Sequence, residues 1–292
     1  MKIGFIGLGI MGEAMCRNIV QKHDDTVYVY DIVKEKRDRL VSEGAQACES
    51  CRETAEKADL IITMVPKSEH SRAVVTETLP VLSHTKIYVD MSTIDPGVSV
   101  ELSQLVRNTG ADFLDAPVVK SRPAAEAGKL GIYVGGSEEG YQKILPVLAY
   151  MGENIIRMGD NGKGLIMKIC HNALVSQIQN GVNETSALAA KNGIDILTFA
   201  EAISYGGGQN FYLDSKKNGI AKEDFTTAFS IANMHKDVHI CLDLARDSDL
   251  AMPGEENAAK VYDAAMAEGL GGEDFSATVK VVRNRTYAET SE

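Results

Sequence analysis

The stretch that decides the fold is Lys2-Ile3-Gly4-Phe5-Ile6-Gly7-Leu8-Gly9-Ile10-Met11-Gly12. Its apolar first half predicts a short strand, its spaced glycines predict a tight turn, and the amphipathic residues 13–22 predict a helix. A second apolar run over residues 26–30 ends at Asp31, about 20 residues after the glycines. This order of strand, glycine turn, helix, strand and acid favours a dinucleotide-binding unit over a chance glycine-rich turn.

Each glycine of the turn meets a different physical requirement. Gly7 permits the tight turn, Gly9 lets the backbone approach a pyrophosphate, and Gly12 allows the helix to pack closely. The N-terminus of the helix supplies N–H groups and the positive end of its dipole to the phosphates. The candidate cofactor-binding loop is therefore Gly7-Leu8-Gly9-Ile10-Met11-Gly12.

Asp31 sets the expected cofactor. Its carboxylate would accept hydrogen bonds from the adenosine ribose hydroxyls and repel a 2′-phosphate, so we expect NAD, with NADP less favoured. Three cations just downstream would soften that preference: Lys34, Lys36 and Arg37.

Apolar runs that alternate with helical segments continue to about residue 158. The further runs expected as strands are 60–65, 86–90, 112–118, 131–136 and 153–158. Strands separated by helical segments predict a mostly parallel sheet with helices on both faces. Ligands of such sheets bind beyond the carboxyl ends of the strands, where Val65-Pro66 and Ser92-Thr93 lie.

The character of the sequence changes at Gly159-Asp160-Asn161-Gly162-Lys163-Gly164. Turn residues here give way to long helical patterns without strand alternation, at about 195–205, 232–245 and 257–267. The predicted fold class is α/β, with a dinucleotide-binding domain over residues 1–162 and a second, helical domain over residues 163–292.

The longest expected helix opens at Gly164 and runs to about Asn192. One face of it carries polar residues: Lys168, Asn172, Ser176, Gln179 and Asn183. Residues four apart lie on the same face of a helix, and a polar stripe on an apolar helix is typical of exposure to water. We favour a functional face instead, because the dinucleotide-binding unit before it needs a proton donor beside it.

Composition excludes several classes of partner. The chain has 292 residues, 44% hydrophobic and 24% charged, with 30 Lys+Arg against 41 Asp+Glu and a net charge of −11. Without a basic run, we expect no nucleic-acid and no membrane partner. With no secretory signal or membrane-length apolar run evident, and an odd number of cysteines, we expect a cytoplasmic protein with reduced thiols. No cluster of histidine, cysteine and carboxylate residues has evident ligand spacing, so no metal is expected.

Several motifs follow the glycine loop in a fixed order: Asp90-Met91-Ser92-Thr93, Asp115-Ala116-Pro117-Val118, Gly162-Lys163-Gly164 with Lys168 and Asn172, and His235-Lys236-Asp237. Together they resemble the β-hydroxyacid dehydrogenase family, which includes 3-hydroxyisobutyrate dehydrogenase, tartronate semialdehyde reductase and the succinic/glyoxylate semialdehyde reductases. The resemblance covers nearly the whole chain. It implies an N-terminal Rossmann-type domain, an all-α C-terminal domain for substrate binding and dimerisation, an active site in the cleft between them, and a homodimer or homotetramer.

The resemblance also implies roles for individual residues. Lys168 is the implied general acid/base, which fits the proton transfer that hydride exchange with NAD requires, since a lysine shielded from water loses its proton more readily. Asn172 is implied to fix the lysine or the substrate. Val65 and Pro66 are expected beside the cofactor, and Ser92 and Thr93 near the nicotinamide ribose and the substrate. Lys236 would close the site from the helical domain, although without the family a solvated Lys236-Asp237 pair is the simpler interpretation.

The chain departs from the family after Val118. Members commonly continue with Ser-Gly-Gly, which holds the substrate carboxylate, whereas this chain has Val119-Lys120-Ser121-Arg122. Arg122 would grip an oxyanion by a bidentate fork and Lys120 would offer a point charge, as in the sulfolactaldehyde reductase branch. The alternatives are a small anionic substrate with one carboxylate, a sulfonate or dicarboxylate held by Lys120, Ser121 and Arg122, or cations that face solvent or a partner subunit.

Two rival functions remain open. Imine reduction occurs on the same fold, but such relatives usually replace the catalytic lysine. A catalytically inactive nucleotide-binding module is a rival of another class, and loss of the lysine together with an added basic domain would mark it. The favoured prediction is an NAD-dependent dehydrogenase or reductase of a small β-hydroxyacid or its semialdehyde.

Overall fold

The computed structural model describes residues 1–284. The chain divides into two compact units, Met1–Lys168 and Ile169–Glu292. Helix α8 (Lys163–Lys191) is continuous from the first unit into the second. The predicted domain boundary between residues 162 and 163 stays a prediction.

Within the described residues, nine strands form one sheet in the first unit, in the order β3-β2-β1-β4-β5-β6-β8-β7, with β9 also paired to β8. The bounds are β1 Ile3–Ile6, β2 Val27–Tyr30, β3 Gln46–Ala47, β4 Leu60–Thr63, β5 Ile87–Asp90, β6 Asp112–Asp115, β7 Val118–Val119, β8 Leu130–Gly135 and β9 Gly152–Gly159. Strand β8 pairs antiparallel with β6 and β7, and every other described pair is parallel. The predicted mostly parallel sheet is confirmed, and the run expected over 112–118 is divided into β6 and β7.

The strands are apolar on both faces because each face has its own core. In β1, Ile3 and Phe5 belong to one hydrophobic cluster and Ile6 to the other. Strand β4 repeats the alternation, with Ile62 in the first cluster and Ile61 in the second. Since successive side chains of a strand point to opposite faces, helices must cover both faces.

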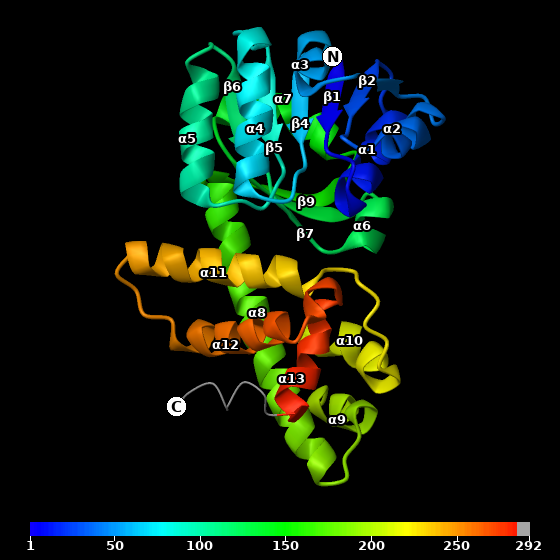
Figure 1. Cartoon of the computed structure of the whole chain (residues 1–292), viewed down its shortest axis with the longest axis vertical. Helices are drawn as coiled ribbons and strands as arrows, with labels where there is room; N and C mark the ends of the chain where they lie inside the picture. Colours follow the sequence, from blue (N-terminus) through cyan, green and yellow to red (C-terminus); the bar gives the residue numbers. More distant parts are fainter. Residues whose placement is uncertain (285–292) are drawn as a thin grey trace. The chain divides into compact units, whose positions relative to one another are not determined.

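Figure 1 shows those helices on the two faces of the sheet. Their bounds are α1 Ile10–Lys22, α2 Lys34–Val41, α3 Cys51–Lys57, α4 Ser68–Thr78, α5 Pro96–Arg107, α6 Arg122–Glu126 and α7 Glu138–Leu148, with a 3-10 turn at Leu79–Val81. Helix α5 starts where the sequence places a strong start signal: the Asp95 side chain accepts a hydrogen bond from the Val98 N–H, and Pro96 occupies the first turn.

The second unit is helical throughout its described part. It contains the rest of α8, then α9 Ile196–Ile203, α10 Phe211–Lys222, α11 Ile231–Asp247, α12 Pro253–Ala267 and α13 Thr278–Asn284, with 3-10 turns at Leu270–Gly272 and Phe275–Ala277. Its core is built from α8, α10, α11, α12 and α13 around Tyr212, Met234 and Tyr262. The predicted α/β class with a second helical domain is confirmed. No described helix is both long enough and apolar enough to cross a bilayer.

Candidate active site

Two glycines of the first loop are required by the protein itself. Gly7 has φ +96, and a Cβ on it would lie 2.4 Å from the Met64 carbonyl oxygen. A Cβ on Gly12 would lie 2.1 Å from the Gly7 carbonyl oxygen. A Cβ on Gly9 would meet nothing within 4 Å, so packing does not demand that glycine. Open space above Gly9 fits the close approach of a pyrophosphate to the backbone.

Helix α1 offers its first N–H groups to that space. Its N-cap residue is Gly9, and no side chain caps the helix. Glu13, in the first turn, would repel a phosphate, but hydrogen bonds to Arg39 and Arg17 hold its carboxylate and keep its pKa below the usual range. The first N–H groups of α1 are therefore free of a side-chain cap, and the charge of Glu13 is balanced by two arginines. This helix start fits the binding of an anionic group.

Asp31 lies at the end of β2 and is 8% exposed. Its carboxylate accepts hydrogen bonds from the Leu8 N–H at 2.7 Å and the Val33 N–H at 2.9 Å, and thereby connects the glycine loop to the second strand. The apolar side chains of Ile10 and Ile32 are 58% and 89% exposed. Exposed apolar side chains at the start of α1 and directly after this acid fit the flat rings of a dinucleotide, a signal that sequence reasoning missed.

Of the three cations near Asp31, only one faces it. Lys36 Nζ lies 3.7 Å from Asp31 Oδ1. Lys34 forms an ion pair with Asp38 at 2.7 Å, and Arg37 donates to the Cys48 carbonyl oxygen and to Glu49. Two of the three residues expected to favour NADP are therefore held by other partners.

The loops after β4 and β5 are joined by Ser92. Its hydroxyl accepts a hydrogen bond from the Val65 N–H at 2.9 Å, its own N–H donates to Asp90 at 3.0 Å, and it is fully buried. Ser92, predicted to contact substrate, thus holds the two strand-end loops in register. Thr93 is partly exposed and Pro66 is exposed at the same carboxyl edge of the sheet.

Asp115 fixes the start of the helix that carries Lys168. Its buried carboxylate accepts hydrogen bonds from the Gly162 N–H at 2.7 Å and the Leu165 N–H at 2.9 Å. Burial raises the pKa of Asp115, and those two donors oppose the rise. A Cβ on Gly164 would lie 2.5 Å from the Tyr133 carbonyl oxygen, so only glycine lets α8 begin this close to β8. The motif at Asp115 and the motif at Gly162 to Gly164 are both visible in the sequence. That the Asp115 carboxylate accepts hydrogen bonds from the start of α8 is visible only in the structure.

Lys168 lies six residues into α8 and is 7% exposed. Asn172 follows one turn later, on the same face, and is 4% exposed. Its amide donates to Asp237 Oδ2 at 2.6 Å, and Lys236 Nζ lies 3.1 Å from Asp237 Oδ1. Because Asp237 is 2% exposed, this is not a solvated pair on a helix surface. Asp237, to which no role was assigned from sequence, connects Asn172 to Lys236.

The rest of the polar stripe on α8 is buried as well. Ser176 donates to Glu255 at 2.7 Å, Gln179 donates to the Phe275 carbonyl oxygen at 2.5 Å, and Asn183 donates to Thr278 at 3.0 Å. The stripe therefore faces the interior, and the water-facing interpretation is wrong.

The substrate loop predicted after Val118 carries paired cations. Lys120 Nζ donates to the Lys129 carbonyl oxygen at 2.7 Å and to Glu153 at 2.9 Å, and Arg122 Nε donates to Glu126 at 2.7 Å. Lys120 has φ +77, a conformation that favours glycine, at a position where the family commonly has glycine. Ser121 is the N-cap residue of the short helix α6.

The comparisons with known proteins cover both units. Residues 2–159 match the NAD binding domain of 6-phosphogluconate dehydrogenase, and residues 162–282 match the NAD-binding domain of NADP-dependent 3-hydroxyisobutyrate dehydrogenase. The chain belongs to the β-hydroxyacid dehydrogenase family. It is thus an NAD(P)-binding oxidoreductase, and the predicted family, enzyme class and nicotinamide cofactor are confirmed.

Individual relatives are similar over at least 90% of their own lengths. The 2-(hydroxymethyl)glutarate dehydrogenase of Eubacterium barkeri is 34% identical, over 100% of this chain and 98% of that protein. The mitochondrial 3-hydroxyisobutyrate dehydrogenase of Drosophila melanogaster is 33% identical, over 98% and 90%. Among solved structures, a Mycobacterium tuberculosis 3-hydroxyisobutyrate dehydrogenase with L-serine superposes with a TM-score of 0.89 at 29% identity, covering 97% of this chain and 99% of that one.

Proposed function

We propose that the protein transfers a hydride between NAD(H) and a small β-hydroxyacid or its semialdehyde, with Lys168 as the general acid/base. The observation that carries this proposal is the burial of Lys168, 7% exposed on a helix whose first turn is fixed by Asp115. A buried ammonium group is costly, and a side chain placed so is a candidate for chemistry.

The proton has a defined path in either direction. A nicotinamide dinucleotide held by the glycine loop, Gly7 to Gly12, and Asp31 would supply the hydride chemistry at the reacting carbon. During oxidation the unprotonated Lys168 Nζ takes the hydroxyl proton, and during reduction the ammonium form gives it to the carbonyl oxygen. Asn172, held through Asp237, orients the reacting oxygen or the lysine from the next turn.

We also propose a preference for NAD over NADP. Asp31 supports this preference, because its carboxylate would repel a 2′-phosphate. Of the cations downstream, Arg37 is bound to the Cys48 carbonyl oxygen and Glu49, and Lys36 lies beside Asp31 itself. With saturating substrate and equal, subsaturating cofactor concentrations, NADH should be turned over at least about tenfold faster than NADPH. Faster turnover of NADPH would contradict the assignment.

A second substrate class is favoured by the loop after Val118. The relative from Eubacterium barkeri is named for 2-(hydroxymethyl)glutarate, whose carbon skeleton carries two carboxylates. Arg122 and Lys120 replace the neutral glycine-rich loop of the family, so a second anionic group, either carboxylate or sulfonate, is the candidate partner for them. Their bonds to Glu126 and Glu153 lie at the surface, where exchange of partners costs little.

The oligomeric state is part of the proposal. Leu174 and Leu188 on α8 are 61% and 64% exposed, and Phe211 on α10 is 84% exposed. Apolar side chains of this size on helices support a homodimer or homotetramer. Sedimentation equilibrium would give the subunit count, and a monomer at micromolar concentration would contradict it.

The deciding experiment is a steady-state screen with both cofactors. Hydroxymonocarboxylates, hydroxydicarboxylates and hydroxysulfonates of three to six carbons, and the matching semialdehydes, are followed by nicotinamide absorbance. We expect one class to give a kcat/KM at least about a hundredfold above the others. Tight NADH binding without turnover of any member would instead support an inactive nucleotide-binding module.

A further inference from the structure

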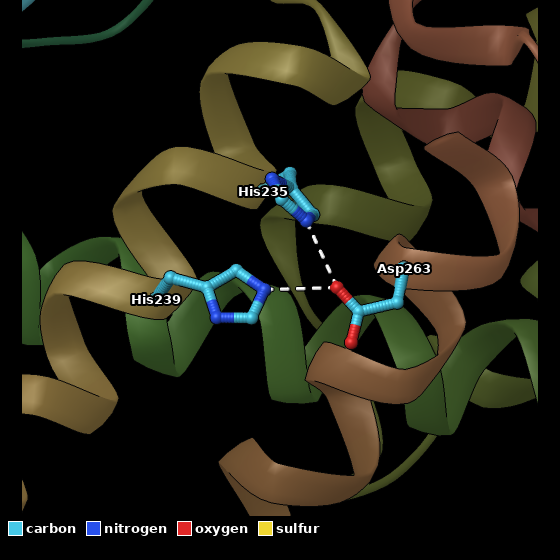
Figure 2. A group of neighbouring side chains, drawn as sticks. All are labelled: His235, His239 and Asp263. Atoms are coloured by element: carbon cyan, nitrogen blue, oxygen red, sulfur yellow. Dashed lines mark hydrogen bonds and ion pairs between the residues drawn. The ribbon is translucent and has the colours of Figure 1, made fainter. Parts of the chain in front are cut away.

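Two histidines and a carboxylate converge on the surface of the second unit. His235 and His239 lie on α11, and Asp263 lies on the neighbouring helix α12 (Figure 2). Each histidine Nε2 is 2.9 Å from the same oxygen, Asp263 Oδ1. One candidate ligand atom from each residue lies within 4.8 Å of the others. Their side chains are 28%, 43% and 53% exposed, so water and ions reach them.

The arrangement follows from helix geometry. His235 and His239 are four residues apart, so they occupy consecutive turns of one face, the spacing by which helical histidine pairs bind zinc. Helix α12 packs against α11 and presents one oxygen of Asp263 to both imidazoles (Figure 2). The histidine pair is visible in the sequence, but no metal was expected from it because the third candidate ligand, Asp263, lies 24 residues after His239 and comes near it only through the packing of α12 on α11.

We propose that His235, His239 and Asp263 bind a divalent transition-metal ion of the Zn²⁺ class. Zinc bonds to histidine nitrogen and carboxylate oxygen are about 2.0–2.1 Å, which puts the ligand atoms of a tetrahedral site about 3.3 Å apart. The two nitrogen–oxygen distances of 2.9 Å therefore need to open by only a few tenths of an ångström. Three protein ligands leave the remaining position to water.

The ligand chemistry selects the metal. Two imidazole nitrogens and one carboxylate suit Zn²⁺, Co²⁺, Ni²⁺ and Cu²⁺, whereas Ca²⁺ and Mg²⁺ prefer shells made of oxygen alone. Protons compete for the same imidazole nitrogens, so binding weakens as the pH is lowered. Calcium and magnesium serve as matched negative controls in the same titration.

Metal binding would cross-link α11 and α12 within the second unit. His235 and His239 flank Asp237 along α11, and Asp237 faces the interior, where it accepts the hydrogen bond from Asn172. The metal would hold the outer face of this segment while Asn172 holds its inner face. The expected effect is on the stability of the folded protein, since none of the three ligands is a residue proposed to bind cofactor or substrate.

The test uses the full chain without a histidine tag, stripped of metal with a chelator. Zn²⁺ is titrated in competition with a chromophoric chelator, and the expected result is one ion per chain. Saturating Zn²⁺ should raise Tm by about 3 °C, and Ca²⁺ and Mg²⁺ should leave it unchanged. His239→Ala and, separately, Asp263→Asn should each weaken Zn²⁺ binding by at least about tenfold.

Two variants serve as controls, because other side chains of the protein also bind zinc. His70→Ala removes an exposed histidine of the first unit, and Cys170→Ser removes the exposed thiol. Both should keep wild-type affinity. Co²⁺ bound at the proposed site should lack the intense thiolate-to-metal band that a cysteine site gives.

Binding that survives both His239→Ala and Asp263→Asn, or is lost in Cys170→Ser, would overturn the proposal. So would the absence of Zn²⁺ binding to the wild type, which would leave the cluster as a hydrogen-bonded His–Asp group only. If His239→Ala fails to fold, Asp263→Asn decides, because the amide keeps the size of the carboxylate and loses its charge.

Discussion

Two groups of polar side chains stand as candidates to act on an anionic substrate, and they differ in exposure. The first is the face of α8 that carries Lys168 and Asn172, both less than one-tenth exposed. The second is the pair Lys120, just before α6, and Arg122, its first residue; their side chains are 40% and 60% exposed. The buried group has fixed partners, whereas the exposed cations pair with carboxylates that are themselves half exposed.

Burial decides what each group contributes. A buried polar group that loses its partner keeps its full desolvation cost, so its geometry is fixed by the fold. An exposed ion pair contributes little to stability and exchanges partners easily. We therefore expect changes on the α8 face to alter catalysis and stability, and changes to the exposed pair to alter only substrate affinity.

The largest effect is expected for Lys168→Met. Methionine keeps the length of the side chain but cannot carry the proton, so kcat should fall by about 10³-fold or more while NADH affinity stays within about twofold. Steady-state kinetics and NADH fluorescence titration measure the two quantities. Lys163→Met, an exposed lysine in the first turn of the same helix, is the matched control and should keep wild-type kcat. Full turnover by Lys168→Met would remove the basis of the proposed mechanism.

Asn172→Ala should give the next largest effect. It takes a hydrogen-bond donor from the buried Asp237 carboxylate, so the free energy of unfolding should fall by about 2 kcal/mol, measured by urea denaturation. We expect kcat/KM to fall by about tenfold to a hundredfold as well. Asn192→Ala, directly after the same helix, loses only a surface bond to the Leu188 carbonyl oxygen and should change neither quantity. If both variants had the same free energy of unfolding and the same kcat/KM, the buried face of α8 would contribute no more to stability or catalysis than the helix surface.

The pH dependence of stability tests the buried face of α8 through Glu255, which accepts a hydrogen bond from Ser176. Its burial raises the pKa of Glu255 from 4.5 to about 7, against the hydrogen bonds from Ser176 and Gln177. Because the pKa of Glu255 is higher in the folded protein than in the unfolded chain, the folded state binds the proton more tightly. This contribution to the free energy of unfolding is complete below about pH 4.5 and is lost as the pH rises through about 7. Glu255→Gln cannot ionise, so its stability relative to wild type should increase by about 2 kcal/mol between pH 5 and pH 8.

The control for that comparison is Glu256→Gln, the exposed neighbour in the same turn of α12. Chemical denaturation of both variants and of wild type is measured at the same pH values. A difference between Glu255→Gln and wild type that does not change with pH would contradict the raised pKa of Glu255.

The same contrast explains how far the sequence could be used for prediction. The glycine loop was predictable because strand, turn and helix follow one another within Ile3–Lys22, and the turn needs a positive φ at Gly7 and close packing of α1 at Gly12. The partners of the buried stripe were not, because they are distant in the chain. Asp237 is 65 residues from Asn172, and Glu255 is 79 residues from Ser176.

Exceptions to local rules were the other source of error. Lys120 adopts a left-handed conformation at φ +77, which no local pattern predicts for a lysine. Helix α10 contains Gly219, a weak helix former, and strand β3 is only two residues long. Each of these features runs against local propensity or gives too short a pattern, so a single sequence does not reveal it.

The smallest effect is expected for Arg122→Ala, and it depends on the substrate. For a hydroxydicarboxylate or hydroxysulfonate KM should rise by about fivefold with kcat unchanged, whereas for a hydroxymonocarboxylate neither should change. The free energy of unfolding should stay within about 0.5 kcal/mol of wild type, because the Arg122–Glu126 pair is exposed. Lys143→Ala, which breaks the equally exposed i,i+4 pair with Glu139, is the matched control.

The outcome for Arg122→Ala separates the two substrate classes without reference to Lys168. A KM that rises only for substrates with a second anionic group means that the guanidinium exchanges Glu126 for the substrate. An unchanged KM for every substrate means that Arg122 stays with Glu126, and the loop after Val118 then has no part in recognition. Because the argument for a dicarboxylate or sulfonate rests on these two cations after Val118, the second result would also weaken that argument and favour the simple β-hydroxyacid.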